Sequence, residues 1–140
     1  MPQLPTTNAS PVLRIDFSND ATWEAICDEM QQPSSEGSEA RIELIDDRKF
    51  DGLSKQQLLS AVPKDYPHTF IIVVDRKAIV DKEHPVLIVN LYDGLGSEVG
   101  AEFRSLPSEI HAIENNLSIA NMDFVEFAGA VDANGIYRGF

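Results

Sequence analysis

Aspartate residues come directly after several of the apolar segments of the chain. Asp16, Asp46 with Asp47, and Asp75 each come after a run that is typical of a β-strand. If these strands are parallel, their carboxyl ends meet at one edge of a sheet, where ligands bind in open α/β folds. Two or three carboxylates there would offer the oxygen ligands that Mg²⁺ takes. Asp also caps helices and forms turns, and we favour that interpretation.

Like charges gathered at one edge repel each other, so a cation or nearby bases must offset them. Arg48, Lys49, Arg76 and Lys77 lie close to these acids in the sequence. We therefore predict internal ion pairing, no tight metal site, and a polar, partly open cleft lined by Asp16, Asp46, Asp47 and Asp75.

Other chemical signals are weak. His68, His84 and His111 lack the short spacings of zinc ligands. The chain has no G-x-S-x-G motif and no glycine-rich phosphate loop. The single cysteine, Cys27, excludes an internal disulfide and lies on an amphipathic helix face, which predicts a core position. We predict no catalytic residue, metal or cofactor, and we favour a protein that is not an enzyme.

A run rich in asparagine separates two predicted helices. Asn115, Asn116 and Asn121 alternate there with apolar residues. Two interpretations are open: a polar recognition surface, or side chains that bond the backbone at a helix-to-helix corner. We favour the corner.

Net charge excludes some partners. The chain has 23 Asp and Glu against 11 Lys and Arg, a net charge of −12. Nucleic acid and anionic membranes would be repelled, whereas a basic partner or a cation would be attracted. No apolar run approaches the roughly 20 residues that span a bilayer, and the start lacks the features of a signal peptide. These features predict a soluble, cytoplasmic protein.

Hydrophobic periodicity predicts the fold. A disordered leader over residues 1–11 precedes a single α/β domain over 12–140, with a mixed, largely parallel sheet of about five strands and helices on both faces. The element order is β-α-β-α-β-β-β-α-α. The strand over 40–45 should turn Ile42 and Leu44 inward and Arg41 and Glu43 to solvent. Expected strands cover 12–17, 40–45, 69–74, 86–89 and 101–104. The direction of the strand at 86–91 relative to that at 69–75 stays open.

Several short segments of the sequence resemble those of a family of small acidic proteins known only as a domain of unknown function. They are Asp16-Phe17-Ser18-Asn19-Asp20 with Trp23, Asp46-Asp47-Arg48, Tyr66-Pro67-His68, Glu83-His84-Pro85, the run from Glu114 to Phe124, and Arg138-Gly139-Phe140. The resemblance covers Val12 to Phe140 and implies a domain that stands alone, but it transfers no activity. The element order is also similar to a thioredoxin-like fold, without its Cys-x-x-Cys motif.

The leading expectation is a non-catalytic binding or regulatory module that recognises a protein partner or a small polar ligand. One alternative is an enzyme that uses the strand-end carboxylates, with or without Mg²⁺, on a small polar substrate. A second is an acidic immunity-type inhibitor of a basic partner.

Overall fold

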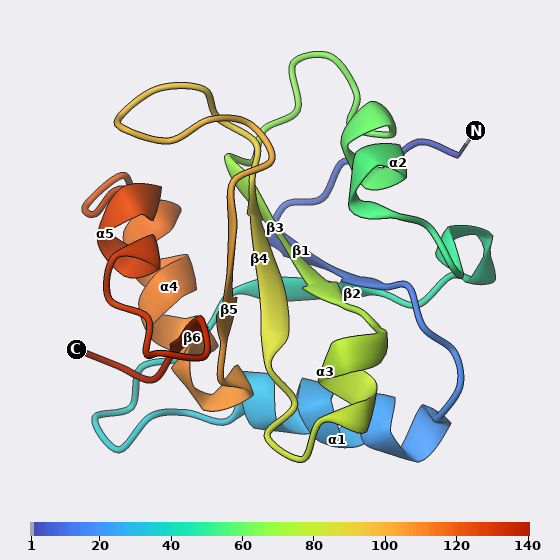
Figure 1. Ribbon diagram of the computed structural model, residues 1–140, viewed down its shortest axis with the longest axis horizontal. Helices are drawn as coiled ribbons and strands as arrows, with labels where there is room; N and C mark the ends of the chain where they lie inside the picture. The colour runs from blue at the N-terminus through green and yellow to red at the C-terminus, as the bar shows by residue number, and fades with distance from the viewer. Residues whose placement is uncertain (1) are drawn as a thin grey trace.

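The central sheet has a cluster of buried apolar side chains on each of its two faces. The computed structural model describes residues 2–140, and there six strands form one sheet in the order β2-β1-β3-β4-β5-β6 (Figure 1). All residues of β3 and β4, whose sequences are apolar at nearly every position, are buried, and so are those of β1. The strands are β1 (Ser10–Arg14), β2 (Ile42–Ile45), β3 (Phe70–Val74), β4 (Val86–Asn90), β5 (Glu102–Ser105) and β6 (Ile136–Tyr137).

The sheet is mixed, which confirms the predicted α/β class. β1 pairs in parallel with both β2 and β3, while β4 is antiparallel to β3 and β5 is antiparallel to β4. A parallel crossover needs a dozen or more residues, and the segment 75–85 is shorter, so the chain returns antiparallel. The sixth strand, β6, pairs in parallel with β5 and was not predicted. The thioredoxin-like arrangement stays a prediction.

Two helical layers cover the sheet. On one face α1 (Asp20–Gln31), α4 (Ile110–Leu117) and α5 (Phe124–Ala128) pack on the strands. On the other face lie α2 (Lys55–Ser60), the short helix η1 (Arg48–Phe50) and the N-terminal segment. The remaining helices are α3 (Arg76–Val80) and η2 (Pro107–Glu109). Within residues 2–140, none of these helices has the length and apolar character to cross a membrane.

Local signals set most helix starts. Ser54 and Gln57, three residues apart, form both bonds of a capping box at α2. Pro107 begins η2, which leads into α4. The cap of α1 is Asn19, whose side chain accepts from the Thr22 N–H.

Two expectations differ from the structure. Leu44 is 36% exposed instead of inward, because β2 is the edge strand and only one neighbouring strand shields it. The boundary of the leader predicted over residues 1–11, whose Met1 lies outside the described residues, also differs. There Leu4 is buried and its N–H donates to the Ala61 carbonyl, and β1 already begins at Ser10. An apolar anchor among polar residues explains this, since Leu4 packs with Phe50 and Leu58.

Candidate functional site

The carboxyl ends of the three parallel strands lie at one edge of the sheet, here called the carboxyl edge. Asp16 follows β1, Asp46 and Asp47 follow β2, and Asp75 follows β3. All four candidate residues of the predicted cleft therefore lie at this edge, as the parallel pairings require.

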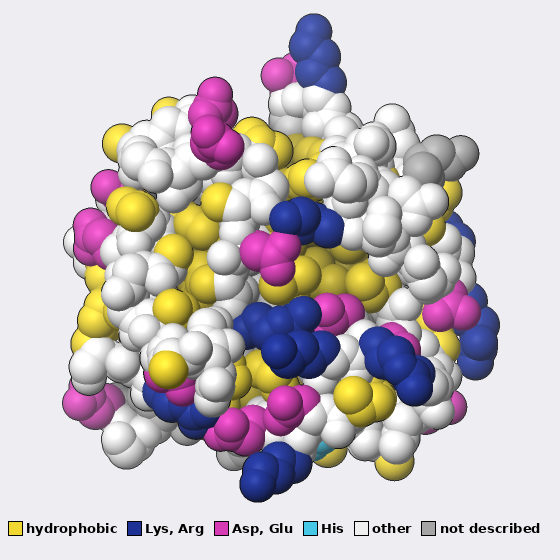
Figure 2. Space-filling model, in the orientation of Figure 1, with side chains coloured by type: hydrophobic (Ala, Val, Ile, Leu, Met, Phe, Trp, Pro, Cys, Tyr) yellow, Lys and Arg dark blue, Asp and Glu magenta, His cyan; other side chains and the backbone are white. Residues whose placement is uncertain are grey.

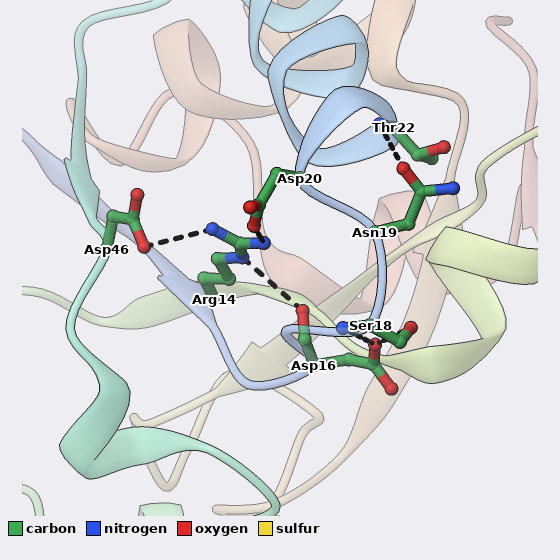
Figure 3. A network of polar contacts seen from close by, with 7 residues as sticks. All are labelled: Arg14, Asp16, Ser18, Asn19, Asp20, Thr22 and Asp46. Atoms are coloured by element: carbon green, nitrogen blue, oxygen red, sulfur yellow. Dashed lines mark hydrogen bonds and ion pairs between the residues drawn. The ribbon is translucent and has the colours of Figure 1, made fainter.

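Arg14, at the end of β1, neutralises much of the carboxyl edge (Figure 3). Its side chain is 4% exposed and forms ion pairs with Asp20 and, at 3.2 Å, with Asp46. The guanidinium carbon lies 4.2 Å from the Phe17 ring centroid and 5.3 Å from that of Trp23. Hydrogen bonds and stacked rings thus fix this cation in place.

Asp75 caps α3 and also pairs with an arginine. Its Oδ1 accepts from the Ala78 N–H at 3.1 Å. Arg104 on β5 donates to its two oxygens at 3.0 and 2.7 Å. Asp47 likewise caps η1 by accepting from the Lys49 N–H at 3.0 Å. These contacts support the capping interpretation of the strand-end acids.

The Asp16 carboxylate accepts its hydrogen bonds from Ser18, two residues further along the chain. Burial alone would raise the pKa of Asp16, but hydrogen bonds donated by the Ser18 hydroxyl and N–H outweigh it and lower that pKa below its usual value. Arg76 approaches only to 3.8 Å.

The four bases predicted to pair with the strand-end acids do not form the short ion pairs at this edge. Among the four proposed, Lys49 and Arg76 form only long ion pairs of 3.6 and 3.8 Å. Arg14 and Arg104 supply the short contacts, and both come from strands. An arginine inside an apolar strand was the available signal, because a buried guanidinium must have partners.

The four acids do not share one hollow. Asp16 and Asp75 line a hollow of about 480 Å³ between α2 and α3, the α2–α3 hollow, whose apolar floor and charged walls are visible near the centre of Figure 2. Asp46 lines a separate hollow with Arg14, and Asp47 lines neither. Over residues 2–140, no group of three or more His, Cys, Asp or Glu side chains is placed to hold a metal ion.

The three asparagines stabilise the end of α4. Asn116 donates to the Ala112 carbonyl at 2.7 Å and accepts from Asn121 at 2.8 Å. Asn115 donates to the Glu39 carbonyl at 2.9 Å. These bonds support the helix-to-helix corner that the sequence favours.

The opposite edge, where β1 and β3 begin, is here called the amino edge, and it has a polar hollow of about 510 Å³. Six polar or charged residues are buried among those the structure describes, and three of them, Thr7, Ser10 and Glu114, line this hollow. His68, Arg41 and Ser118 also line it. Convergent buried polar groups in a concave site are typical of a ligand site.

Glu114 is the buried acid of the polar hollow. It is 6% exposed, and its carboxylate accepts from the Arg41 main-chain N–H at 2.7 Å and from the Ser118 hydroxyl at 2.6 Å. The Asn115 amide adds a third, longer bond of 3.3 Å. None of these three donors carries a charge.

An apolar pocket of about 260 Å³ adjoins the polar hollow. It lies between the loop over 91–100 and the α4–α5 corner. Both sites share the wall residues Thr69, Phe70, Leu117 and Ala120.

Asn90 positions the loop beside the apolar pocket. This buried side chain donates to the carbonyls of Tyr92 and Glu98 at 2.6 and 2.8 Å. Tyr92 and Leu95 are thereby presented on the surface, where both side chains are exposed.

The segments that form the apolar pocket carry mainly acidic charges, and Lys55 on α2 contacts the 91–100 loop only at its end, where its Nζ donates to the Gly100 carbonyl at 3.0 Å. Arg104 is the only Lys or Arg between Lys82 and Arg138 in the sequence. The upper left of Figure 2, where the 91–100 loop and α5 lie, accordingly shows hydrophobic and acidic side chains without a basic one.

A family described as a domain of unknown function (DUF6924) matches residues 9–140. The chain belongs to this family. No curated protein matches the chain significantly. The family match confirms the resemblance found in the sequence, and its description names no ligand or reaction.

The sequence did not point to the amino edge as a site. Ser10 and Thr7 fell in the supposed leader, and Glu114 was seen only as part of the asparagine-rich run. His68 was considered only as a zinc ligand, although it lies just before β3 and lines this hollow. The shared location of these residues depends on contacts between segments far apart in the chain.

Proposed function

We propose that this chain is a non-catalytic binding module that holds a protein partner at its apolar pocket. The observation that carries the proposal is this pocket of about 260 Å³ with Tyr92 and Leu95 exposed at its wall. Val125 on α5 is a further exposed apolar side chain beside the loop, because it lies next to Gly96. Such a site suits one large apolar side chain of a partner, the usual anchor of a protein interface.

The charge around the pocket favours a basic partner. Asp123 lines the pocket, and Asp93, Glu98 and Glu126 are exposed on the loop and on α5. With no base on these segments, a partner whose anchor is flanked by Lys or Arg would be attracted and oriented. An acidic immunity-type inhibitor of a basic partner is one form of this function.

The enzyme alternative has less support. Catalysis by the strand-end carboxylates requires groups free to act on a substrate. Asp75 instead accepts from Arg104 and Ala78, and Asp46 accepts from Arg14.

A peptide library displayed on phage tests the proposal. We expect selected peptides to contain an apolar residue flanked by Lys or Arg, and to bind with micromolar dissociation constants. Leu95→Lys should weaken binding about 10-fold or more, which corresponds to about 1.4 kcal/mol, because it removes apolar wall and reverses the local charge.

The matched control is Val80→Lys. Val80 on α3 is 63% exposed and Leu95 is 62% exposed, so both variants change a similarly exposed apolar side chain to the same base. Val80→Lys should leave peptide binding unchanged. Equal weakening by both variants, or selected peptides without basic residues, would contradict the proposal.

A further inference from the structure

The polar hollow has a hydrogen-bonding character of its own, separate from the apolar pocket. Hydroxyl groups, an imidazole and a carboxylate bonded to one another line it, contributed by Thr7, Ser10, Ser118, His68 and Glu114. Its remaining polar lining consists of exposed side chains, those of Thr6, Asn8, Arg41 and Thr69. The positions of the protons on these groups decide which ligand they can bind, because each group has a fixed inventory of donors and acceptors.

The hydroxyl protons of the serines point along a chain that ends at the carboxylate. Ser118 donates its single proton to Glu114 Oε2 at 2.6 Å. Ser10 Oγ lies 3.3 Å from Ser118 Oγ, and must be the donor in that pair because the Ser118 proton is already committed. The lone pairs of Ser10 are therefore left as acceptors.

His68 and Thr7 follow the same rule. The Thr7 hydroxyl donates to the Ala9 carbonyl at 2.6 Å. His68 Nε2 lies 2.8 Å from the Thr7 carbonyl, which only accepts, so Nε2 carries the proton. In the neutral ring, Nδ1 is then an acceptor.

Glu114 has no cation to balance its charge. It is absent from every ion pair formed among residues 2–140. Arg41 contributes its main-chain N–H, while its guanidinium belongs to an exposed residue at the rim. A buried carboxylate without a counter-charge is costly, and a positive group in the hollow would offset that cost.

We propose that the polar hollow binds a small organic cation, with a primary ammonium group directed at Glu114 and at the lone pairs left on Ser10. An ammonium has three donors and no acceptor, which matches a wall whose buried groups present acceptors. The volume of about 510 Å³ leaves room for the carbon chain beside Leu117 and Phe70. This site goes beyond the proposed partner binding and does not depend on it, because Leu95 and Tyr92 are not part of its lining.

Titration of the ¹⁵N-labelled protein with primary alkylamines of increasing length tests the proposal by NMR. The matched probes are the alcohol and the carboxylate of the same carbon number. We expect saturable shifts at Ser10, His68 and Ser118 with amine dissociation constants in the millimolar range, as befits ligands of a few heavy atoms. Alcohols and carboxylates should bind about 10-fold more weakly or worse, because they lack the charge that pairs with Glu114.

Glu114→Gln removes the charge with almost no change in shape, and should weaken amine binding about 10-fold or more. Glu24→Gln on the exposed side of α1 is the control for net charge and should have no effect. If Glu114→Gln does not fold, Asn8→Trp provides a second variant. Asn8 is exposed and lines the polar hollow but not the apolar pocket, so a large ring there should block the hollow without disturbing the core.

Three results would overturn the proposal: alcohols that bind as well as amines, amine shifts that map elsewhere, or Glu114→Gln that keeps the wild-type affinity. Loss of peptide binding in Leu95→Lys with amine binding intact would separate this site from the apolar pocket.

Discussion

At the carboxyl edge, Arg14 and Arg104 donate hydrogen bonds to acids that follow strands, Asp46 and Asp75, whereas at the amino edge Glu114 accepts only from uncharged groups. The first set of polar residues holds the strand ends and helix starts together. The second surrounds a hollow and has acceptors left over. Acids that follow strands are therefore better signs of capping and pairing in this protein than of a ligand site. Four variants test this difference, and each is compared with a control variant elsewhere in the chain.

The largest effect should come from Trp23→Ala. Trp23 is buried in the core, with its ring beside Arg14 at the carboxyl edge, so its loss leaves a cavity and should reduce the free energy of unfolding by about 3–5 kcal/mol. Ile119→Ala at the α4–α5 corner is the control, since Ile119 is exposed and its change should stay within about 0.5 kcal/mol. Urea unfolding measures both, and similar costs would mean that Trp23 is not a core residue.

Next in size is a comparison of two arginines, one at each edge. Arg14→Met should cost about 2 kcal/mol, because it removes hydrogen bonds to Asp20 and Asp46 from a buried position. The cost stays below that of a fully buried pair because both acids are at least half exposed and can be solvated. Arg41→Met should be near neutral, since its bond to Glu114 comes from the main chain. Equal costs in denaturant titrations would remove the contrast between the edges.

A smaller effect is expected from Asn90→Ala. The variant leaves the carbonyls of Tyr92 and Glu98 without their donor and should cost about 1–2 kcal/mol. It should also weaken peptide binding at the apolar pocket, because the 91–100 loop loses its tie to β4. Asn134→Ala, at an exposed position, serves as the control. Retained peptide affinity in Asn90→Ala would show that the loop keeps its shape without this side chain.

The smallest effect concerns acid stability at the carboxyl edge. The lowered pKa of Asp16 means that its stabilising contribution is complete above the unfolded value of about 4 and is lost as pH falls through the folded pKa. The free energy of unfolding should therefore fall less steeply between about pH 5 and about pH 2 in Asp16→Asn than in the wild type. Asp28→Asn on the exposed side of α1 is the control. A steeper fall in Asp16→Asn would contradict the sign of this shift.

Cys27 illustrates a prediction that local pattern made correctly. Its position on the apolar stripe of a helix predicts a core residue, and the structure buries it in α1. Burial raises the pKa of the thiol to about 12, which keeps it protonated at neutral pH. The periodicity of Trp23, Ile26 and Met30 identified the same face, since one stripe of a helix meets the sheet.

The exposure of individual residues was harder to predict than the presence of a strand. The alternation at 42–45 indicates a strand, yet it gives no information on how much of the strand the neighbouring layers cover. Leu44 is exposed because β2 is the edge strand of the sheet. Leu4 shows the opposite error, because the composition of this segment is polar, while the structure buries Leu4 with Phe50 and Leu58 and bonds its N–H to the Ala61 carbonyl.

The sequence by itself determined the α/β class, the central buried strands, the capping box of α2 and the acidity of the chain, because these depend on local periodicity, capping chemistry and charge. Only the tertiary structure decided the direction of β4, the pairing of Arg14 and Arg104 with the strand-end acids, and the meeting of Thr7, Ser10, His68 and Glu114 at one hollow. These features join segments up to about a hundred residues apart, such as Ser10 with Ser118. No local pattern contains such distances, because they are set by the order of strands in the sheet and by the packing of α4 against it.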